Sequence, residues 1–196
     1  THALAGLVAP PDLPARYALD VVEGLVEQLA RFGADLVGGN VSRGDRLVLD
    51  LALLGEVDPD RLLLRSGARP GDVVMVTGAL GGAAAARAAR AAVPESTEIP
   101  ADDLTAVDLR LDDPEPRLGV APLLRLGGAT AAIDVSDGLA ADVGHLCDRS
   151  GVGVRIEAAR LPVDASAATV ARVLGADALA WALSGGVDYE LLVTAD

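Results

Sequence analysis

The chain has 196 residues, which is enough for one large domain or two small ones. Hydrophobic residues make up 51% of it and aromatic residues only 2%, so its core has to be built from Ala, Val and Leu. The formal net charge of −13 argues against the basic surface that nucleic-acid binding requires, so no nucleic-acid partner is expected.

All 16 basic residues are Arg, so the P-loop lysine found in many nucleotide-binding proteins is missing. An anionic substrate would have to be held by metal ions, individual Arg residues or helix N-termini. Cys147 is the only cysteine, so no disulfide can form within the chain and a reducing, cytoplasmic location is expected. Apolar runs end well before the ~20 residues that a membrane span needs, so no membrane association is expected.

The first 57 residues predict a small unit of strands around one helix. Apolar residues predict a strand over 3–9, and their helical spacing predicts an amphipathic helix over 15–32. A short strand is expected over 34–40. Residues 46–57 predict a long strand, and its nearly continuous hydrophobicity indicates burial on both faces or burial against a partner subunit.

The strand over 34–40 ends in Gly38 and Gly39, followed by Asn40. Adjacent glycines allow the backbone to turn tightly and to approach a ligand closely. The Asn40 amide can coordinate a cation through its oxygen or donate to a phosphate through its NH₂ group. A Gly-Asn turn leading into a hairpin explains these residues equally well, so both interpretations stay open.

Residues 58–66 are the best candidate for a domain boundary, because Pro59 and several charges interrupt the apolar pattern there. Arg65 and Arg69 follow in a glycine-containing turn. Each could bind phosphate, although a single Arg in a loop is more often a solvated cation.

A strand over 73–77 leads through Gly81 and Gly82 into an alanine-rich helix over 83–93. This arrangement can offer free N–H groups to a phosphate, or the glycines can simply allow close packing of helix and strand. An acidic segment over 94–114, which includes Glu95, predicts a solvated face with a short helix over 103–111. A further helix is expected over 118–126.

The most informative stretch is 131–139, where an apolar run ends in Asp134, Ser136 and Asp137 before Gly138. The pattern predicts a buried strand, a tight turn and a helix over 139–149. Two carboxylates and a hydroxyl at a helix N-terminus suit Mg²⁺ and phosphate. Asp137 or Ser136 can instead be an ordinary helix cap, which is a common use of these residue types.

The last third of the chain predicts a half-buried strand over 152–157, because apolar residues alternate there with polar ones. Helices are expected over 165–174 and 176–183. The stretch 184–192 then places a glycine pair before a strand that begins with Asp188 and Glu190. A solvated strand edge is the simplest interpretation of these two acids.

Five stretches together, 36–40, 53–57, 65–72, 133–139 and 184–192, resemble the thiamine-monophosphate kinase family of the aminoimidazole ribonucleotide synthetase-like superfamily. The resemblance implies an α/β (α+β) protein and a homodimer. It implies a partial N-terminal domain for ATP binding and dimerisation over 1–57, and a C-terminal α+β domain over 66–196. It also implies that the chain is a fragment lacking both family termini.

The implied activity is the Mg²⁺-assisted, direct transfer of a phosphoryl group from ATP to thiamine monophosphate, which gives thiamine diphosphate. By resemblance, the metal ligands would be Asn40, Asp134 and Asp137. ATP would contact Gly39, Asn40, Arg65 and Ser136, and thiamine monophosphate would contact Val187. No catalytic side chain is assigned.

Two positions depart from the family pattern. The family usually has Asp at position 40, where this chain has Asn, and Glu at position 187, where this chain has Val. Asn40 keeps an oxygen ligand but loses a charge, and Val187 cannot pair with a cationic substrate. The alternatives are therefore a catalytically impaired homologue that binds nucleotide or serves in dimerisation, or another ATP-dependent enzyme of the superfamily.

Overall fold

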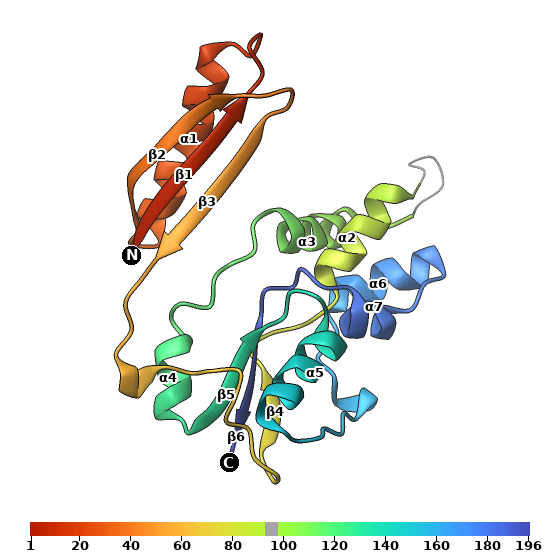
Figure 1. The fold of residues 1–196 in the computed structure, drawn as a ribbon. Coiled ribbons are helices and arrows are strands. Elements are labelled where there is room, and N and C mark those ends of the chain that lie inside the picture. Colours follow the sequence, from red (N-terminus) through yellow and green to blue (C-terminus); the bar gives the residue numbers. More distant parts are fainter. Residues whose placement is uncertain (93–97) are drawn as a thin grey trace. The chain divides into compact units, whose positions relative to one another are not determined.

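A computed structural model describes residues 1–92 and 98–196, which form two compact units, Thr1–Pro59 and Asp60–Asp196 (Figure 1). We call them unit 1 and unit 2 and describe each by itself. The expected end of a helix at Val93 and the acidic Glu95 lie outside the described residues. Among the residues described, no helix combines the length and the apolar character needed to cross a membrane.

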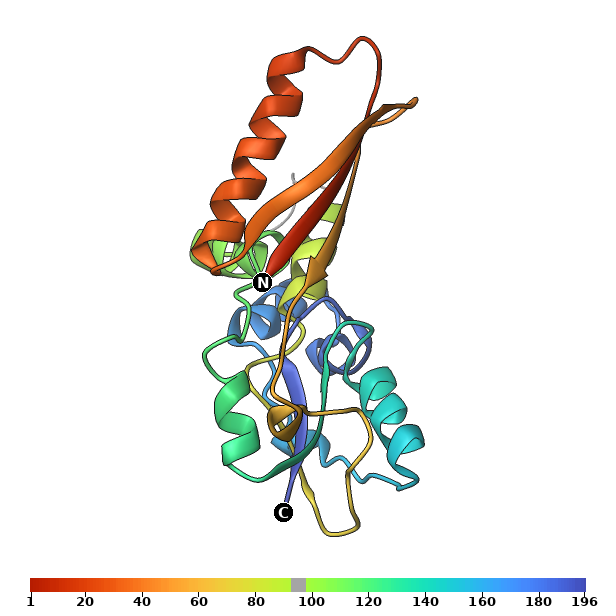
Figure 2. The same cartoon turned by 60° about the vertical axis from the view of Figure 1, so that its left-hand side comes forward.

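Unit 1 is a three-stranded sheet with one helix on one of its faces (Figures 1 and 2). Its elements are β1 (His2–Ala9), α1 (Ala15–Arg31), β2 (Asp35–Arg43) and β3 (Val48–Leu54). The strand order is β2-β1-β3, with β1 parallel to β2 and antiparallel to β3. Ala3, Leu29 and Ala34 form the small core between sheet and helix.

The alternative of a Gly-Asn turn leading into a hairpin is wrong, because β1 lies between β2 and β3 and pairs with both. The glycine pair does not end a strand either, since β2 continues to Arg43. A side chain at Gly39 would collide with the backbone of Ala5 on β1. The close approach that this glycine allows is thus an approach to the neighbouring strand.

Strand β3 is shorter than expected and is not buried within the chain. Every one of its residues is exposed in unit 1, including Leu51 and Leu53, the latter at 60%. Burial on both faces is therefore wrong for the chain by itself. Burial of this strand against a partner subunit stays a prediction.

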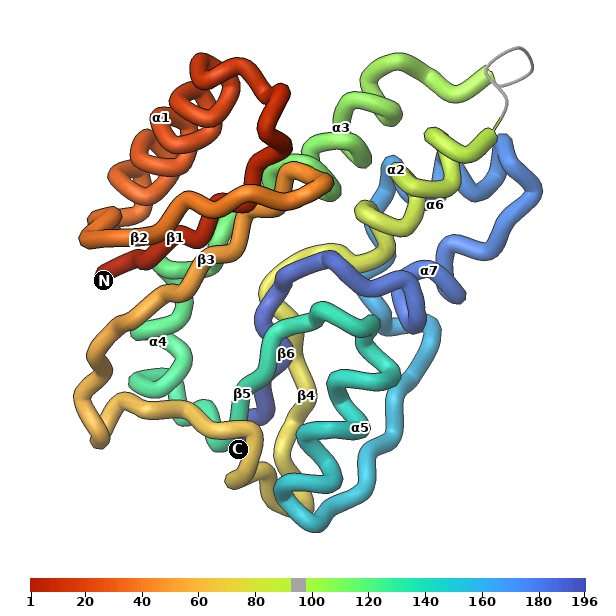
Figure 3. Tube along the Cα trace, turned by 45° about the horizontal axis from the view of Figure 1, so that its top comes forward, coloured from red at the N-terminus to blue at the C-terminus, as the bar shows by residue number. Residues whose placement is uncertain are grey.

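Unit 2 combines a three-stranded antiparallel sheet with two groups of helices (Figures 1 and 3). The strand order is β4-β6-β5. Its helices and strands are β4 (Val73–Val76), α2 (Gly82–Ala91), α3 (Ala101–Asp112), α4 (Ala121–Leu126), β5 (Ala129–Asp134), α5 (Leu139–Ser150), α6 (Ala165–Leu174), α7 (Ala178–Ser184) and β6 (Leu191–Ala195), with 3-10 turns at Pro59–Arg61 and Ala158–Arg160.

Two apolar cores hold unit 2 together. In the first, Ile133 of β5 and Leu192 of β6 pack with Leu146 of α5. The second joins α2, α3 and α6 through small and branched side chains such as Ala86, Val107 and Val170. The abundance of Ala on α2 allows this close helix packing, because four consecutive alanines on that helix are buried.

The expected strand over 152–157 is wrong. Residues 152–157 have no regular secondary structure and lead into the 3-10 turn Ala158–Arg160. Val152 and Ile156 nevertheless pack against the first core, which accounts for the alternating pattern. Alternation indicates an extended, half-buried segment, but a strand also requires a neighbouring backbone with which to pair.

Candidate functional site

The candidate site lies where β5 ends and α5 begins. Along β5, Ala129, Ala131 and Ile133 are buried and alternate with more accessible residues, so the strand ends with Asp134 half-exposed. Val135 is buried and its N–H donates to the carbonyl of Glu190 at 2.8 Å. Ser136 and Asp137 follow at the surface, half-buried and exposed respectively.

A buried carboxylate inside α5 satisfies the N–H groups of this turn. Oδ2 of Asp142 accepts hydrogen bonds from the backbone N–H groups of Ser136, Asp137 and Gly138, at 3.0, 3.1 and 3.2 Å. Gly138 is the N-cap residue, and no side chain caps the helix from that position. The alternative that Ser136 or Asp137 is the helix cap is therefore wrong.

The same three contacts limit how the turn before the helix can bind phosphate. N–H groups that donate to Asp142 are not free to donate to an anion. The side chains of this segment offer oxygens to a ligand, namely the carboxylates of Asp134 and Asp137 and the hydroxyl of Ser136. One carboxylate oxygen each of Asp137 and Asp142 and one ring nitrogen of His145 also lie within 4.8 Å of one another.

Asp142 and His145 were missed in the sequence, although a signal for Asp142 was present. Helical spacing places Asp142 and Leu146 on the same face of the helix, and the structure buries both. A charged residue on an apolar helix face requires a partner inside the protein. Here the partners are the backbone N–H groups of the preceding turn.

A second turn, residues 185–190, packs directly against the first. The N–H of Val187 donates to the carbonyl of Ser136 at 2.8 Å, and the N–H of Tyr189 donates to that of Val135 at 2.9 Å. Val187 and Tyr189 both have positive φ angles, 64° and 50°. Such backbone conformations are strained for branched or bulky residues and persist only where the surrounding structure holds them.

Asp188 and Glu190 are buried in this second turn, so the expected solvated strand edge is wrong. Asp188 is 8% exposed and accepts the N–H of Gly81 through both carboxylate oxygens at 3.0 Å. Burial raises the pKa of Asp188 above its usual range, against the opposing effect of the Gly81 and Ala83 N–H groups. β6 begins only after these acids, at Leu191.

Glu190 is 1% exposed and forms the centre of an ion-pair cluster. It accepts the guanidinium of Arg117, the hydroxyl of Thr77 at 2.6 Å and a longer contact from Arg110 at 3.4 Å. Burial acts to raise the pKa of Glu190, but the hydrogen bonds from Arg117 and Thr77 outweigh it, so this pKa lies below its usual range. The cluster connects β6 to the segment before α4 and to α3.

The Asp188 contact also decides between the two interpretations of Gly81 and Gly82. The N–H of Gly81 is used by Asp188 and is not free for phosphate. A Cβ atom at Gly82 would lie 2.7 Å from the Arg110 side chain, and Gly81 has a φ of 92°. These glycines serve close packing.

Arg65 lies near the strand end that carries Asp134. Both residues line a shallow cavity of about 530 Å³ in unit 2, together with Ser66 and Arg149. The hydroxyl of Ser150 donates to the Arg65 carbonyl at 3.2 Å and so anchors this loop to the end of α5. Within unit 2, three segments around the end of β5 thus carry the sequence-based candidates Arg65, Asp134, Ser136, Asp137 and Val187. The other two candidates, Gly39 and Asn40, lie on β2 of unit 1.

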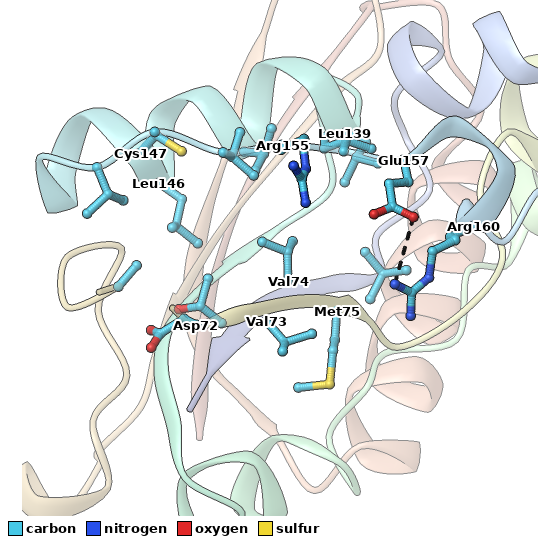
Figure 4. A pocket seen from close by; sticks show the side chains of 18 of the residues that line it. Asp72, Val73, Val74, Met75, Leu139, Leu146, Cys147, Arg155, Glu157 and Arg160 are labelled. Carbon is cyan, nitrogen blue, oxygen red and sulfur yellow. Dashed lines mark ion pairs between the residues drawn. The ribbon is translucent and has the colours of Figure 1, made fainter. Parts of the chain in front are cut away.

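A larger cavity of about 890 Å³ lies between β4, α5 and residues 152–162 (Figure 4). Its walls are largely apolar and include Val74, Leu146 and Cys147, with Arg155 as one of its charged residues. Arg69, the second Arg that could bind phosphate, lines it, but Arg65, Asp134, Ser136, Asp137 and Val187 do not. We therefore assign the candidate site to the turn after β5.

Comparison with known families identifies the family of the chain. Residues 69–190 match the family model "AIR synthase related protein, C-terminal domain". The chain belongs to this family. As an AIR synthase-related protein it has the expected α+β fold, and the matched range contains Asp134, Ser136, Asp137 and Val187.

Relatives of this AIR synthase-related chain include thiamine-monophosphate kinases. The Mycobacterium tuberculosis enzyme is 37% identical over 193 residues, which are 98% of this chain and 56% of that protein. The crystal structure of thiamine monophosphate kinase from Aquifex aeolicus has a TM-score of 0.89 at 32% identity, covering 100% of this chain and 64% of that chain. A structure described as AaThiL complexed with AMPPCP and TMP has the same TM-score and identity, with 61% of that chain covered. The chain thus spans a little over half the length of the relatives it matches.

Proposed function

We propose that the protein containing this chain is a thiamine-monophosphate kinase, which transfers a phosphoryl group from ATP to thiamine monophosphate and forms thiamine diphosphate. Its relatives carry this name, and the related AaThiL structure holds AMPPCP and TMP. The observation that carries the proposal is the turn after β5. Asp142 takes up the N–H groups of that turn, which leaves Asp134, Ser136 and Asp137 to present oxygens beside Val187.

The donor set of this turn fits Mg²⁺. Carboxylate and hydroxyl oxygens are hard ligands of the kind that Mg²⁺ prefers, and Mg²⁺ typically uses one or two carboxylates together with substrate phosphates. A bound Mg²⁺ would supply neutralisation of the phosphate charge, which matters here because the chain has no lysine. Asp134 and Asp137 would hold the ion.

The other residues act by positioning, because in-line phosphoryl transfer depends on alignment and charge neutralisation more than on covalent chemistry. The Ser136 hydroxyl would donate to a phosphate oxygen of ATP. Arg65, beside Asp134, would pair with phosphate. The Val187 position would contact thiamine monophosphate, and no catalytic base is assigned.

Unit 1 would supply the remaining nucleotide contacts and the dimer interface. Gly39 and Asn40 would lie at the ATP, with Asn40 also a metal ligand. The exposed apolar side chains of β3 are consistent with burial against the partner subunit of a homodimer. The free Cys147 is consistent with a reducing, cytoplasmic compartment.

A second candidate is a homologue that binds nucleotide or dimerises but transfers phosphate poorly. Two observations favour it: Asn40 is uncharged, and Val187 cannot form an ion pair or accept a hydrogen bond through its side chain. The complete turn, with Asp134, Ser136 and Asp137 held by Asp142, favours the active kinase.

An assay of the full-length protein tests the proposal. The protein is incubated with Mg·ATP and thiamine monophosphate, and thiamine diphosphate is quantified by chromatography. Thiamine diphosphate formation is expected from the wild type. If neither the wild type nor the double variant Asn40→Asp, Val187→Glu forms it, the kinase assignment is wrong.

A further inference from the structure

The N-terminus of α5 is capped in a different way from those of α6 and α7. The N-cap residues Asp164 and Asp177 accept the N–H groups of the two later helices from outside. At α5, no side chain caps the helix; instead Asp142, in the first turn of the helix and 1% exposed, accepts the N–H groups of the turn that precedes it. One oxygen atom takes three N–H groups.

This arrangement changes what the turn can bind. Free N–H groups at a helix N-terminus attract anions, including carboxylates of the same turn. Free N–H groups of a turn before a helix attract anions in the same way. With the N–H groups of residues 136–138 satisfied by Asp142, the Asp137 carboxylate is not drawn onto that turn and stays exposed. Asp142 also adds a second negative charge within 4.8 Å of Asp137.

The surrounding backbone limits how far the turn can relax without Asp142. A Cβ atom on Gly138 would lie 2.9 Å from Cα of Ser184, and one on Gly186 would lie 2.6 Å from the Ser136 carbonyl oxygen. The turn is therefore closely packed against residues 184–187 on one side. On its inner side, the three hydrogen bonds to Asp142 are its polar anchor.

We propose that Asp142 is a positioning residue that makes this turn a cation site: by accepting the N–H groups of residues 136–138, it directs the side chains of Ser136 and Asp137 outward. Asp142 acts through these residues and does not itself contact the substrates. The inference rests on the proposed function, because it concerns the metal-binding turn of the proposed kinase. It adds a determinant of metal affinity that lies inside the helix.

Direct metal titration of the full-length protein tests the proposal without turnover. Mn²⁺ replaces Mg²⁺ as the probe, and its affinity is measured by electron paramagnetic resonance in the absence of nucleotide. Asp134→Asn identifies the Mn²⁺ that belongs to the turn. Asp142→Ala removes the acceptor, Asp142→Asn keeps an acceptor oxygen without the charge, and Val143→Ala is the control because Val143 is buried next to it.

We expect Asp142→Ala to weaken Mn²⁺ binding at the turn by about 10–100-fold, the usual range for residues that orient metal ligands. Asp142→Asn should recover part of that loss, and Val143→Ala should bind Mn²⁺ like the wild type even if its unfolding temperature falls. Unchanged affinity in a folded Asp142→Ala would overturn the inference. If Asp142→Ala does not fold, an Asp142→Asn affinity equal to that of Val143→Ala would overturn it instead.

Amide hydrogen exchange gives a second readout that needs no metal. In Asp142→Asn, the amides of residues 136–138 should exchange faster than in the wild type, because a neutral acceptor forms weaker hydrogen bonds. Unchanged exchange would contradict the role of Asp142. The two proposals can fail separately. If the wild type forms no thiamine diphosphate but its Mn²⁺ affinity depends on Asp142, the proposed function is rejected and this inference is supported. If the wild type is active and substitution of Asp142 leaves the Mn²⁺ affinity unchanged, only this inference is rejected.

Discussion

The N–H of Val187 donates to the carbonyl oxygen of Ser136 at 2.8 Å, so two segments far apart in the sequence share one hydrogen bond. This contact places Val187, which we propose to contact thiamine monophosphate, beside Ser136, which we propose to contact ATP. In a phosphoryl transfer the two substrates have to meet, and the two turns bring their proposed binding residues together.

Replacement of Val187 tests the assigned substrate position. Val187→Glu should lower the KM for thiamine monophosphate by about 10–150-fold, because a charge-assisted contact to the cationic substrate is worth about 1.5–3 kcal/mol. The substitution should not reduce stability, since it removes a β-branched residue from a φ of 64°. Steady-state kinetics with Val187→Gln as the uncharged control check this, and equal KM values for all three proteins would refute it.

Substitution of Asp137, the exposed carboxylate of the turn, tests whether the proposed site binds a metal ion. Asp137→Asn should weaken Mg·ATP binding by about tenfold, because the ion loses a charged ligand. The unfolding temperature should stay the same, since Asp137 does not cap the helix. Isothermal titration with Mg·ATP measures the affinity, with Asp148→Asn on α5 as a control for the change in net charge. Equal binding by the two variants would show that Asp137 has no role in holding the metal.

At two glycines in and next to α5, substitution by Ala is expected to change the stability of the protein in opposite directions. Gly138→Ala places a side chain at a φ of 110° and against the backbone of Ser184, so it should destabilise the protein by about 1–3 kcal/mol. Gly144→Ala lies inside α5 with nothing within 4 Å, so it should stabilise by about 0.5–1 kcal/mol. Urea denaturation measures both, and loss of stability in both variants would contradict this account of the turn.

Glu190 should make the protein sensitive to acid. Its pKa is lower in the folded state than its ordinary value of 4.5, so its stabilising effect is complete above that value and is lost as the pH falls through the folded-state pKa. Glu190→Gln should cost about 2 kcal/mol at neutral pH and should flatten the stability profile below pH 4.5.

Asp188 should affect the pH dependence of stability in the opposite direction to Glu190, because the pKa of Asp188 is raised in the folded state. Its contribution is present below the unfolded-state pKa and is lost as the pH rises through the folded-state pKa. Chemical denaturation of the wild type and Glu190→Gln across the acid range separates the contributions of Asp188 and Glu190 to the free energy of unfolding. A profile with the same slope in both proteins would argue against the ion pair of Glu190 with Arg117.

The regular helices and the end of β5 could be predicted from the sequence because their apolar spacing reflects one buried face. Strand pairing could not. A hairpin of β2 and β3 is one of two interpretations that the sequence leaves open, but β1 lies between these strands. Residues 152–157 alternate like a strand without having a neighbouring strand. Local patterns carry no information about which backbone is available for pairing.

The restriction to local patterns also explains which residues of the candidate site could be predicted from the sequence. Asp134, Ser136 and Asp137 could be found because they follow a strand directly. Asp188 and Glu190 were interpreted as solvated because their partners, Gly81 and Arg117, lie elsewhere in the chain. A buried acid and an exposed acid look alike in a sequence until the group that compensates the charge is known.

Anomalous diffraction from crystals of the full-length protein soaked with MnCl₂ and AMPPCP tests the central claim most directly. The account predicts an Mn²⁺ peak in contact with Asp134 and Asp137, bridging the protein to the nucleotide phosphates, while Asp142 keeps its three N–H contacts. Phosphates bound directly to the backbone N–H groups of residues 136–138, with no ion at either carboxylate, would contradict it.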